Sequence, residues 1–158
     1  MKFLADCMLG KLSRWLRILG YDTAYDNQID DSELLAAAKD QNRILLTRDR
    51  PLFERAKDIT AVHVNEDNLD SQIAQLVEEV NLNLDRKTFT RCLHCNVLID
   101  EVGPDEVSSV VPPFVLKSQI QFYRCPSCER VYWPGSHAEQ MESRLTAIRE
   151  TTRRISTL

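Results

Sequence analysis

Several features that would place this chain in a familiar class are scarce or missing. Its 158 residues include only 4 Gly and 6 Pro and show no low-complexity tract, which excludes collagen-like and low-complexity chains. No apolar run approaches the roughly 18–20 residues that cross a bilayer. The opening residues MKFLADCMLG place Asp6 in a short apolar stretch and lack the layout of a signal peptide. We therefore expect a cytoplasmic protein with no membrane span.

Cysteine and glycine are also too scarce for several kinds of chemistry. Five cysteines are too few for a disulfide-rich secreted scaffold, and an odd number leaves one thiol outside any pairing scheme. The chain has no glycine-rich phosphate loop and no serine in a nucleophile-elbow pattern. The sequence therefore gives no support to the common nucleotide-binding loops or to a serine hydrolase.

The charges are distributed unevenly along the chain. The formal net charge of −4 argues against a uniformly basic surface for nucleic acid. However, residues 1–85 carry 10 Lys and Arg against 16 Asp and Glu, whereas residues 86–158 carry 10 against 8. Four of the five cysteines also lie in the second segment. We therefore predict two domains, 1–85 and 86–158, joined near the polar run 81–91.

The first segment alternates between short apolar runs and amphipathic stretches. Strands are predicted over residues 2–6, 22–25, 43–47 and 60–64. Helices are predicted over residues 10–19, 31–41, 51–57 and 68–82. Gly20 is a helix stop signal, and Pro51 suits a first helical turn. This alternation predicts an α/β fold with a parallel sheet flanked by helices and right-handed crossovers.

The second segment carries two closely spaced pairs of cysteines. They are Cys92-x2-Cys95 and, after 29 residues, Cys125-x2-Cys128. Each pair can present both thiolates from one tight turn, and four sulfurs at ~2.3 Å form the closed tetrahedral site of structural zinc. The linker leaves room for a three-stranded ribbon with a loop at Pro112-Pro113. We therefore predict a zinc ribbon in which Zn²⁺ stabilises a domain whose hydrophobic core is small.

Other interpretations of the second segment stay open. The cysteines could form disulfides or remain free thiols, and His94 or His137 could replace one of them as a metal ligand. Arg124 and Arg130 flank the second pair, and Trp133 lies beside them, a pattern typical of phosphate contact and base stacking. Trp133 fits the core of a small domain equally well. A basic C-terminal helix and tail is predicted from Arg144, Arg149, Arg153 and Arg154.

Carboxylates follow two of the predicted strands. Asp6 closes the first strand, and Asp49 follows the third strand by one residue. If those strands are neighbours, their ends lie ~5 Å apart and the two carboxylates converge. Asp30 and Asp31 open the second helix, where one can cap the helix and the other can reach inward. Oxygen ligands select Mg²⁺ or Mn²⁺, so these residues predict a cation site, although Asp31 and Asp49 also suit plain helix caps.

Five stretches of the chain resemble a known family. They are FLADCMLGKLSRWLRILGYDT, DDSELLAAA, RILLTRDRPLF, RCLHCNVLI and FYRCPSCERVYWPGSH. In this order and spacing they resemble the Mut-seven C-terminal RNase domain, a PIN-like nuclease domain followed by a zinc ribbon, over roughly residues 1–145. The resemblance implies a PIN-like sheet and a metal-dependent nuclease whose acidic residues are Asp6, Asp31 (or less favourably Asp30) and Asp49. A fourth acidic residue is often present in such sites, and the stretch 62–67 offers no clear match.

Taken with the resemblance, the sequence predicts a ribonuclease acting on single-stranded RNA with a structural Zn²⁺ and a catalytic Mg²⁺ or Mn²⁺. The candidate RNA contacts are Arg14, Arg17, Arg48, Arg50, Arg124, Arg130, Trp133 and His137. Arg14 and Arg17 fit a solvated helix face equally well. The alternatives are a non-catalytic RNA-binding module associated with ribosomes or tRNA, and a subunit whose ribbon docks onto an unspecified protein partner.

Overall fold

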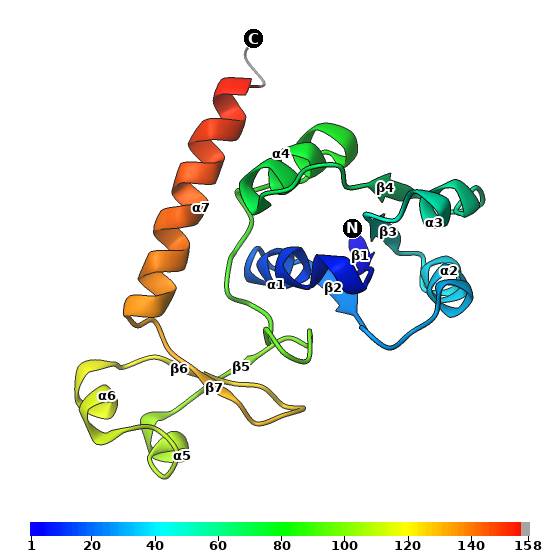
Figure 1. Cartoon of the computed structure of the whole chain (residues 1–158). Coiled ribbons are helices and arrows are strands. Elements are labelled where there is room, and N and C mark those ends of the chain that lie inside the picture. Colours follow the sequence, from blue (N-terminus) through cyan, green and yellow to red (C-terminus); the bar gives the residue numbers. More distant parts are fainter. Residues whose placement is uncertain (156–158) are drawn as a thin grey trace. The chain divides into compact units, whose positions relative to one another are not determined.

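The first part of the chain is built on a four-stranded parallel sheet. The computed structural model describes residues 1–155, and contacts divide the chain into two compact units, Met1–Asn96 and Val97–Leu158 (Figure 1). In the first unit the strands lie in the order β2-β1-β3-β4 and all pair in parallel. Their bounds are β1 (Lys2–Ala5), β2 (Asp22–Tyr25), β3 (Ile44–Thr47) and β4 (Ala61–His63). The predicted parallel α/β sheet is confirmed.

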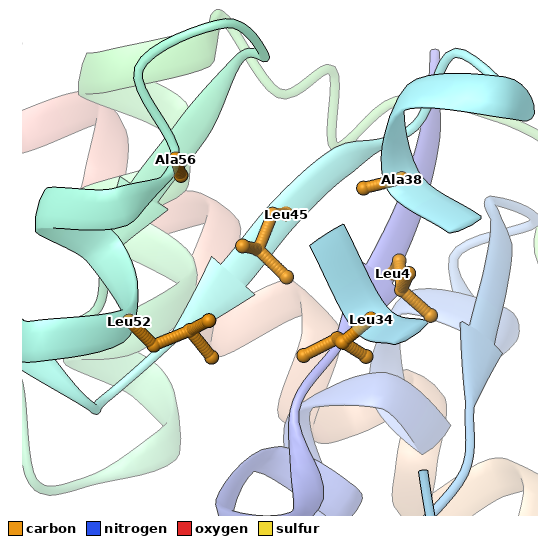
Figure 2. Packing of buried hydrophobic residues seen from close by; sticks show 6 residues of the cluster. All are labelled: Leu4, Leu34, Ala38, Leu45, Leu52 and Ala56. Atoms are coloured by element: carbon orange, nitrogen blue, oxygen red, sulfur yellow. The ribbon is translucent and has the colours of Figure 1, made fainter. Parts of the chain in front are cut away.

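Helices alternate with the strands of this sheet. The chain forms α1 (Gly10–Ile18), α2 (Asp31–Asp40), α3 (Arg50–Arg55) and, after the last strand, α4 (Leu69–Val80), close to the predicted bounds, and a short 3-10 turn η1 (Cys7–Leu9) that was not predicted. Leu4 of β1 pairs with Leu45 of β3, and both pack with Leu34 of α2 and Leu52 of α3 (Figure 2). Helix α1 packs against α4. Helices therefore flank the sheet as the alternating sequence pattern predicted.

The strand order places a switch point at the centre of the sheet. From β1 the chain crosses to β2 at one edge, whereas from β3 it crosses to β4 at the other. In open parallel sheets a crevice forms beyond the carboxyl ends of the strands where the direction reverses. Here that position lies at the ends of β1 and β3, which are hydrogen-bonded neighbours.

The polar segment after α4 packs onto the first unit. The Tyr21 hydroxyl donates to the Asn83 carbonyl at 2.9 Å and accepts from the Asn83 N–H at 2.8 Å. Further along, the Phe89 N–H donates to the Ile18 carbonyl at 2.8 Å. Gly20 has φ of +80°, and a Cβ there would lie 2.7 Å from the Lys87 carbonyl oxygen. The run predicted as a junction therefore packs against the end of α1 and the turn that leads into β2.

The second unit contains a small antiparallel sheet and three helices. The strands β5 (Asp100–Val102), β6 (Phe122–Arg124) and β7 (Val131–Tyr132) pair in that order. Between β5 and β6 lie α5 (Pro104–Val107) and α6 (Pro113–Ser118), so Pro113 begins a helix where a loop was predicted. One buried hydrophobic cluster of this unit consists of Val107, Val111, Val115 and Phe122.

The predicted basic C-terminal helix is present as α7 (Ser136–Ile155). Residues 156–158 of the predicted second domain and its tail lie outside the described residues. Within the part of the chain that the structure describes, no helix has the length and apolar character needed to cross a membrane.

Candidate functional site

The carboxylate of Asp6 lies at the switch point, directly after β1. Asp6 is only 4% exposed, so its carboxylate requires hydrogen-bond donors. One oxygen accepts the main-chain N–H of Met8 at 2.9 Å, and the other accepts the N–H of Arg48 at 2.9 Å. The second oxygen also accepts the hydroxyl of Thr47, the last residue of β3. These donors hold the carboxylate in one orientation between the ends of β1 and β3.

Thr47 joins Asp6 to the beginning of α3. The Thr47 hydroxyl, which donates to Asp6, also accepts the main-chain N–H of Asp49 at 2.9 Å. The carboxylate of Asp49 accepts the N–H of Leu52 at 2.8 Å and therefore caps α3, with Pro51 in its first turn. Asp49 is exposed, so one carboxylate oxygen can cap the helix while the side chain still borders solvent.

The two acidic residues that open α2 have different partners. Asp30 caps the helix by accepting the N–H groups of Ser32 at 2.8 Å and Glu33 at 2.9 Å. Asp31 instead forms an ion pair with Arg55 at the end of α3, with 3.0 Å between the Asp31 carboxylate and Nη1. Both side chains of this pair are about half exposed, at 56% and 49%. Asp31 is therefore the acidic residue of this turn that faces α3.

The four cysteines form the one cluster of metal-ligating side chains found among the described residues. The ligand atoms of Cys92, Cys95, Cys125 and Cys128 all lie within 4.8 Å of one another. Sulfurs at ~2.3 Å from a tetrahedral zinc would lie about 3.8 Å apart, which this spacing accommodates. In each pair the N–H of the second cysteine faces the sulfur of the first, at 3.3 Å and 3.4 Å. The cluster could therefore hold a metal ion such as zinc.

Neither predicted histidine substitute belongs to this metal cluster, since His94 and His137 are outside it. The carboxylates of Asp6, Asp31 and Asp49 likewise form no three-membered metal-ligating group in the described part of the chain. Thr47 links two of these residues through hydrogen bonds, while Arg55 engages the third.

The chain was compared with family models, curated proteins and solved structures. A family model described as the Mut7-C RNAse domain matches residues 1–145 of the 158. The chain belongs to this family. Membership indicates a nuclease or otherwise RNA-related function. Comparisons with curated proteins and with solved structures find no match.

In this Mut7-C domain, two arginines predicted to contact RNA lie next to Asp49. Arg48 forms an ion pair with Asp67 at 2.6 Å, and Arg50 pairs with Glu54 at 3.1 Å. Asp67 comes from the stretch where a fourth acidic residue was sought, and its carboxylate is engaged by Arg48. Arg14 is exposed on α1.

Arg17 lies in neither of the two environments considered from the sequence, an RNA contact or a solvated helix face. Its side chain is buried, with 7% exposed, and its guanidinium donates to the carbonyls of Thr23, Leu93 and His94. We therefore omit Arg17 from the proposed RNA contacts, because its N–H groups serve main-chain carbonyls inside the first unit. Asn96, which contacts the same strand, was missed by sequence reasoning; its place directly after Cys95 was the one local signal.

In the second unit, Arg130 and His137 are exposed, and Arg124 donates to a main-chain carbonyl of the same unit. Trp133 is partly buried against Phe122, with 6.5 Å between ring centroids. The interpretation of Trp133 as part of the small core therefore has direct support.

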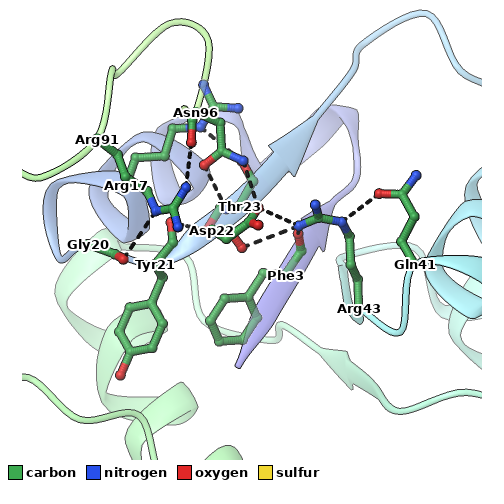
Figure 3. Close-up of polar contacts among 10 residues, drawn as sticks. All are labelled: Phe3, Arg17, Gly20, Tyr21, Asp22, Thr23, Gln41, Arg43, Arg91 and Asn96. Carbon is green, nitrogen blue, oxygen red and sulfur yellow. Dashed lines mark hydrogen bonds and ion pairs between the residues drawn. The ribbon is translucent and has the colours of Figure 1, made fainter. Parts of the chain in front are cut away.

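A polar network also surrounds Asp22 and Thr23 of β2 (Figure 3). Asp22 pairs with Arg43 at 2.6 Å and accepts the Asn96 side-chain amide at 2.8 Å. Burial by itself raises the pKa of Asp22, but hydrogen bonds from Arg43 and Asn96 and the charges of Arg43 and Arg91 outweigh it and hold the pKa below its ordinary value. Asp22 is therefore a charged structural residue at this edge. Burial raises the pKa of the neighbouring Tyr21, although its bond to Asn83 and the charge of Arg86 oppose the shift.

Proposed function

We propose that the protein is a Mg²⁺- or Mn²⁺-dependent ribonuclease that hydrolyses phosphodiester bonds in single-stranded RNA. The observation that carries the proposal is the buried carboxylate of Asp6 at the sheet switch point, linked through Thr47 to the segment that holds Asp49. Family membership supports nuclease chemistry, and the carboxylates supply the oxygen ligands that these cations prefer.

Each acidic residue has a defined role in this proposal. Asp6 is a ligand held in place by main-chain N–H groups, and Asp49 is a second ligand carried at the start of α3. Asp31 binds the cation after its ion pair with Arg55 breaks. Breaking this pair costs little free energy, because exposed ion pairs contribute only about 0–1 kcal/mol to stability. When bound, Mg²⁺ or Mn²⁺ supplies charge neutralisation at a phosphate and activation of water.

The remaining residues bind RNA or stabilise the second unit. Arg14, Arg48 and Arg50 are the proposed phosphate contacts of the first unit. The proposed RNA contacts of the second unit are Arg124, Arg130, Trp133 and His137. Arginine side chains there suit phosphate contact, and the aromatic side chain suits stacking on an unpaired base. The four-cysteine cluster holds a structural Zn²⁺, because four thiolates leave no open coordination position for catalysis.

The test is cleavage of single-stranded and duplex RNA by the full chain with Mn²⁺ or Mg²⁺. Asp6→Asn should abolish cleavage and Asp40→Asn should not, because Asp40 is exposed at the opposite end of α2 from Asp31. Equal cleavage by wild type and Asp6→Asn would show that the activity comes from a contaminant or from another site. Equal cleavage of duplex RNA would contradict the single-strand preference.

A non-catalytic RNA-binding module is the second candidate, favoured by the Arg55 contact that engages Asp31 in the structure. It predicts RNA binding that weakens with salt, that Asp6→Asn leaves unchanged, and that is accompanied by no cleavage with any divalent cation. Arg130→Gln should reduce the salt dependence of binding if this exposed residue contacts phosphate. Absence of RNA binding at moderate salt would instead favour a protein-docking subunit.

A further inference from the structure

The loop that carries Cys92 and Cys95 is bonded to α1 and β2 within the first unit. Only Leu93 and His94 separate the two cysteines, and both of their carbonyls accept from Nη1 of Arg17, at 2.9 Å and 3.0 Å. Nε of the same guanidinium donates to the Thr23 carbonyl at 2.9 Å. One buried side chain on α1 therefore binds both the metal-ligating loop and the edge strand.

Asn96, the residue after Cys95, makes a second connection to the same strand (Figure 3). Its side-chain oxygen accepts the Thr23 N–H at 2.9 Å, and its amide donates to Asp22 at 2.8 Å. Its main-chain N–H closes the turn onto the Cys92 carbonyl at 2.9 Å, with φ of +67°. Its carbonyl accepts from Arg91 at 2.7 Å.

These contacts cover an edge of the sheet that would otherwise be open. Strand β2 is the terminal strand of the order β2-β1-β3-β4, and both main-chain polar groups of Thr23 bond to Arg17 or Asn96. Unpaired groups on an edge strand are usually covered by another part of the chain. Here the covering segment is itself half of a metal-ligating cluster.

We propose that Arg17 and Asn96 are positioning residues that hold the Cys92–Cys95 loop in its zinc-binding conformation, so that zinc affinity and the stability of the β2 edge are coupled. Residues that orient metal ligands commonly affect metal affinity by about 10- to 100-fold. The positive charges of Arg17 and Arg91 beside this loop also favour four thiolates, whose complex with Zn²⁺ carries a net negative charge. Coupling between binding sites is reciprocal, so zinc in turn stabilises the edge contacts.

This coupling rests on the zinc assignment made above and not on RNA cleavage. A protein that cleaves no RNA could still show it, and an active nuclease could lack it. The alternative is that the loop only covers the edge strand, in which case Arg17 and Asn96 affect folding but not the affinity for zinc.

Zinc affinity is measured by competition between the full-length, zinc-loaded protein and a chromogenic chelator. The variants are Arg17→Gln and Asn96→Gly, the second of which removes the side chain and still permits the left-handed backbone. Each should lose about tenfold or more in zinc affinity. Lys11→Gln, which removes an exposed cation from the same helix, should bind zinc like wild type. Affinities of both folded variants within about twofold of wild type would overturn the proposal.

A measurement on the wild-type protein decides the question if the variants do not fold. Amide hydrogen exchange at Thr23 should accelerate about tenfold or more when a chelator removes zinc, because its N–H donates to Asn96. Exchange at Leu45, whose N–H donates to Thr60 inside the sheet at 3.0 Å, should change little. Equal exchange at Thr23 with and without zinc would contradict the coupling.

Discussion

The hydroxyl of Thr47 donates a hydrogen bond to the carboxylate of Asp6. Thr47 is fully buried and Asp6 nearly so, which makes this contact part of the sheet interior as well as of the candidate cation site. The same hydroxyl accepts the N–H of Asp49 at 2.9 Å. One side chain thus binds the carboxylate of Asp6 and the main chain that carries Asp49.

Thr47→Val should therefore impair both stability and cleavage. The valine leaves the buried carboxylate of Asp6 without its hydroxyl donor, which should cost about 1–3 kcal/mol in the free energy of unfolding. Cleavage of RNA with Mn²⁺ should fall about tenfold or more, because a ligand loses its orienting partner. Urea unfolding and initial cleavage rates measure the two effects. Thr47→Ser keeps the hydroxyl and should stay close to wild type; wild-type cleavage by the valine variant would rule out the positioning role.

Substitutions of Asp49 separate its capping role from its proposed role as a ligand. Asp49→Ala removes the cap of α3 and should cost about 1 kcal/mol, whereas Asp49→Asn keeps a capping oxygen and should cost little. Both variants lack the carboxylate, so both should lose cleavage if Asp49 binds the cation. Thermal unfolding and cleavage assays on the pair distinguish the roles. Full activity in the asparagine variant would leave Asp49 as a helix cap alone.

Gly20→Ala should destabilise the first unit by about 1–3 kcal/mol. The positive φ disfavours any side chain, and the added Cβ would meet the Lys87 carbonyl at 2.7 Å. Gly103→Ala is the control, because its Cβ would lie 3.5 Å from a flexible Glu106 oxygen, an ordinary contact. Chemical denaturation of both variants gives the comparison, and equal costs would mean that segment 86–91 does not restrain Gly20.

The lowered pKa of Asp22 predicts a pH-dependent contribution to stability. Because the pKa is lower in the folded state, the charged carboxylate stabilises the fold above the unfolded-state value of about 3.9 and loses this effect as pH falls through the folded-state value. Asp22→Asn should cost about 1–3 kcal/mol near pH 7, since it removes a charged partner of Arg43 and Asn96.

The difference in unfolding free energy between wild type and Asp22→Asn should be constant from about pH 7 to pH 5 and shrink below about pH 4. Chelator present at every pH keeps zinc release out of the comparison. A difference that does not change on acidification would show that Asp22 is not held in its charged form by these partners.

Local signals predicted most of the first unit. The stop signal at Gly20, the acidic residues before α2 and Pro51 each act within one helical turn, so the predicted bounds of the helices lie close to those observed. The alternation of elements did not determine which strands are neighbours, and the structure shows that β1 and β3 pair. In the second unit the local pattern was less informative about secondary structure. Val107 and Val111 are both buried, but they lie at and just after the short helix α5 and not in a strand.

Long-range contacts explain what the sequence could not reveal. Arg17 looked like one of several exposed cations on α1, and its burial depends on carbonyls more than 70 residues away. The partners of the carboxylates could not be predicted either, since the pairing of Asp31 with Arg55 depends on how α2 and α3 pack on the sheet. Motif spacing supplied the candidate residues, whereas their hydrogen-bond partners required the fold.

The docking of the Cys92–Cys95 loop has a consequence for the order of synthesis. Arg17, Asp22 and Thr23, and every strand and helix of the parallel sheet, precede this loop in the chain. A ribosome therefore completes the surface that receives the loop before it adds the 29 residues leading to Cys125. The nascent chain can present two aligned thiolates to zinc while the other two are still untranslated. When Cys125 and Cys128 follow, they close a loop onto Cys92 and Cys95. The entropic cost of closing that loop rises only slowly with its length.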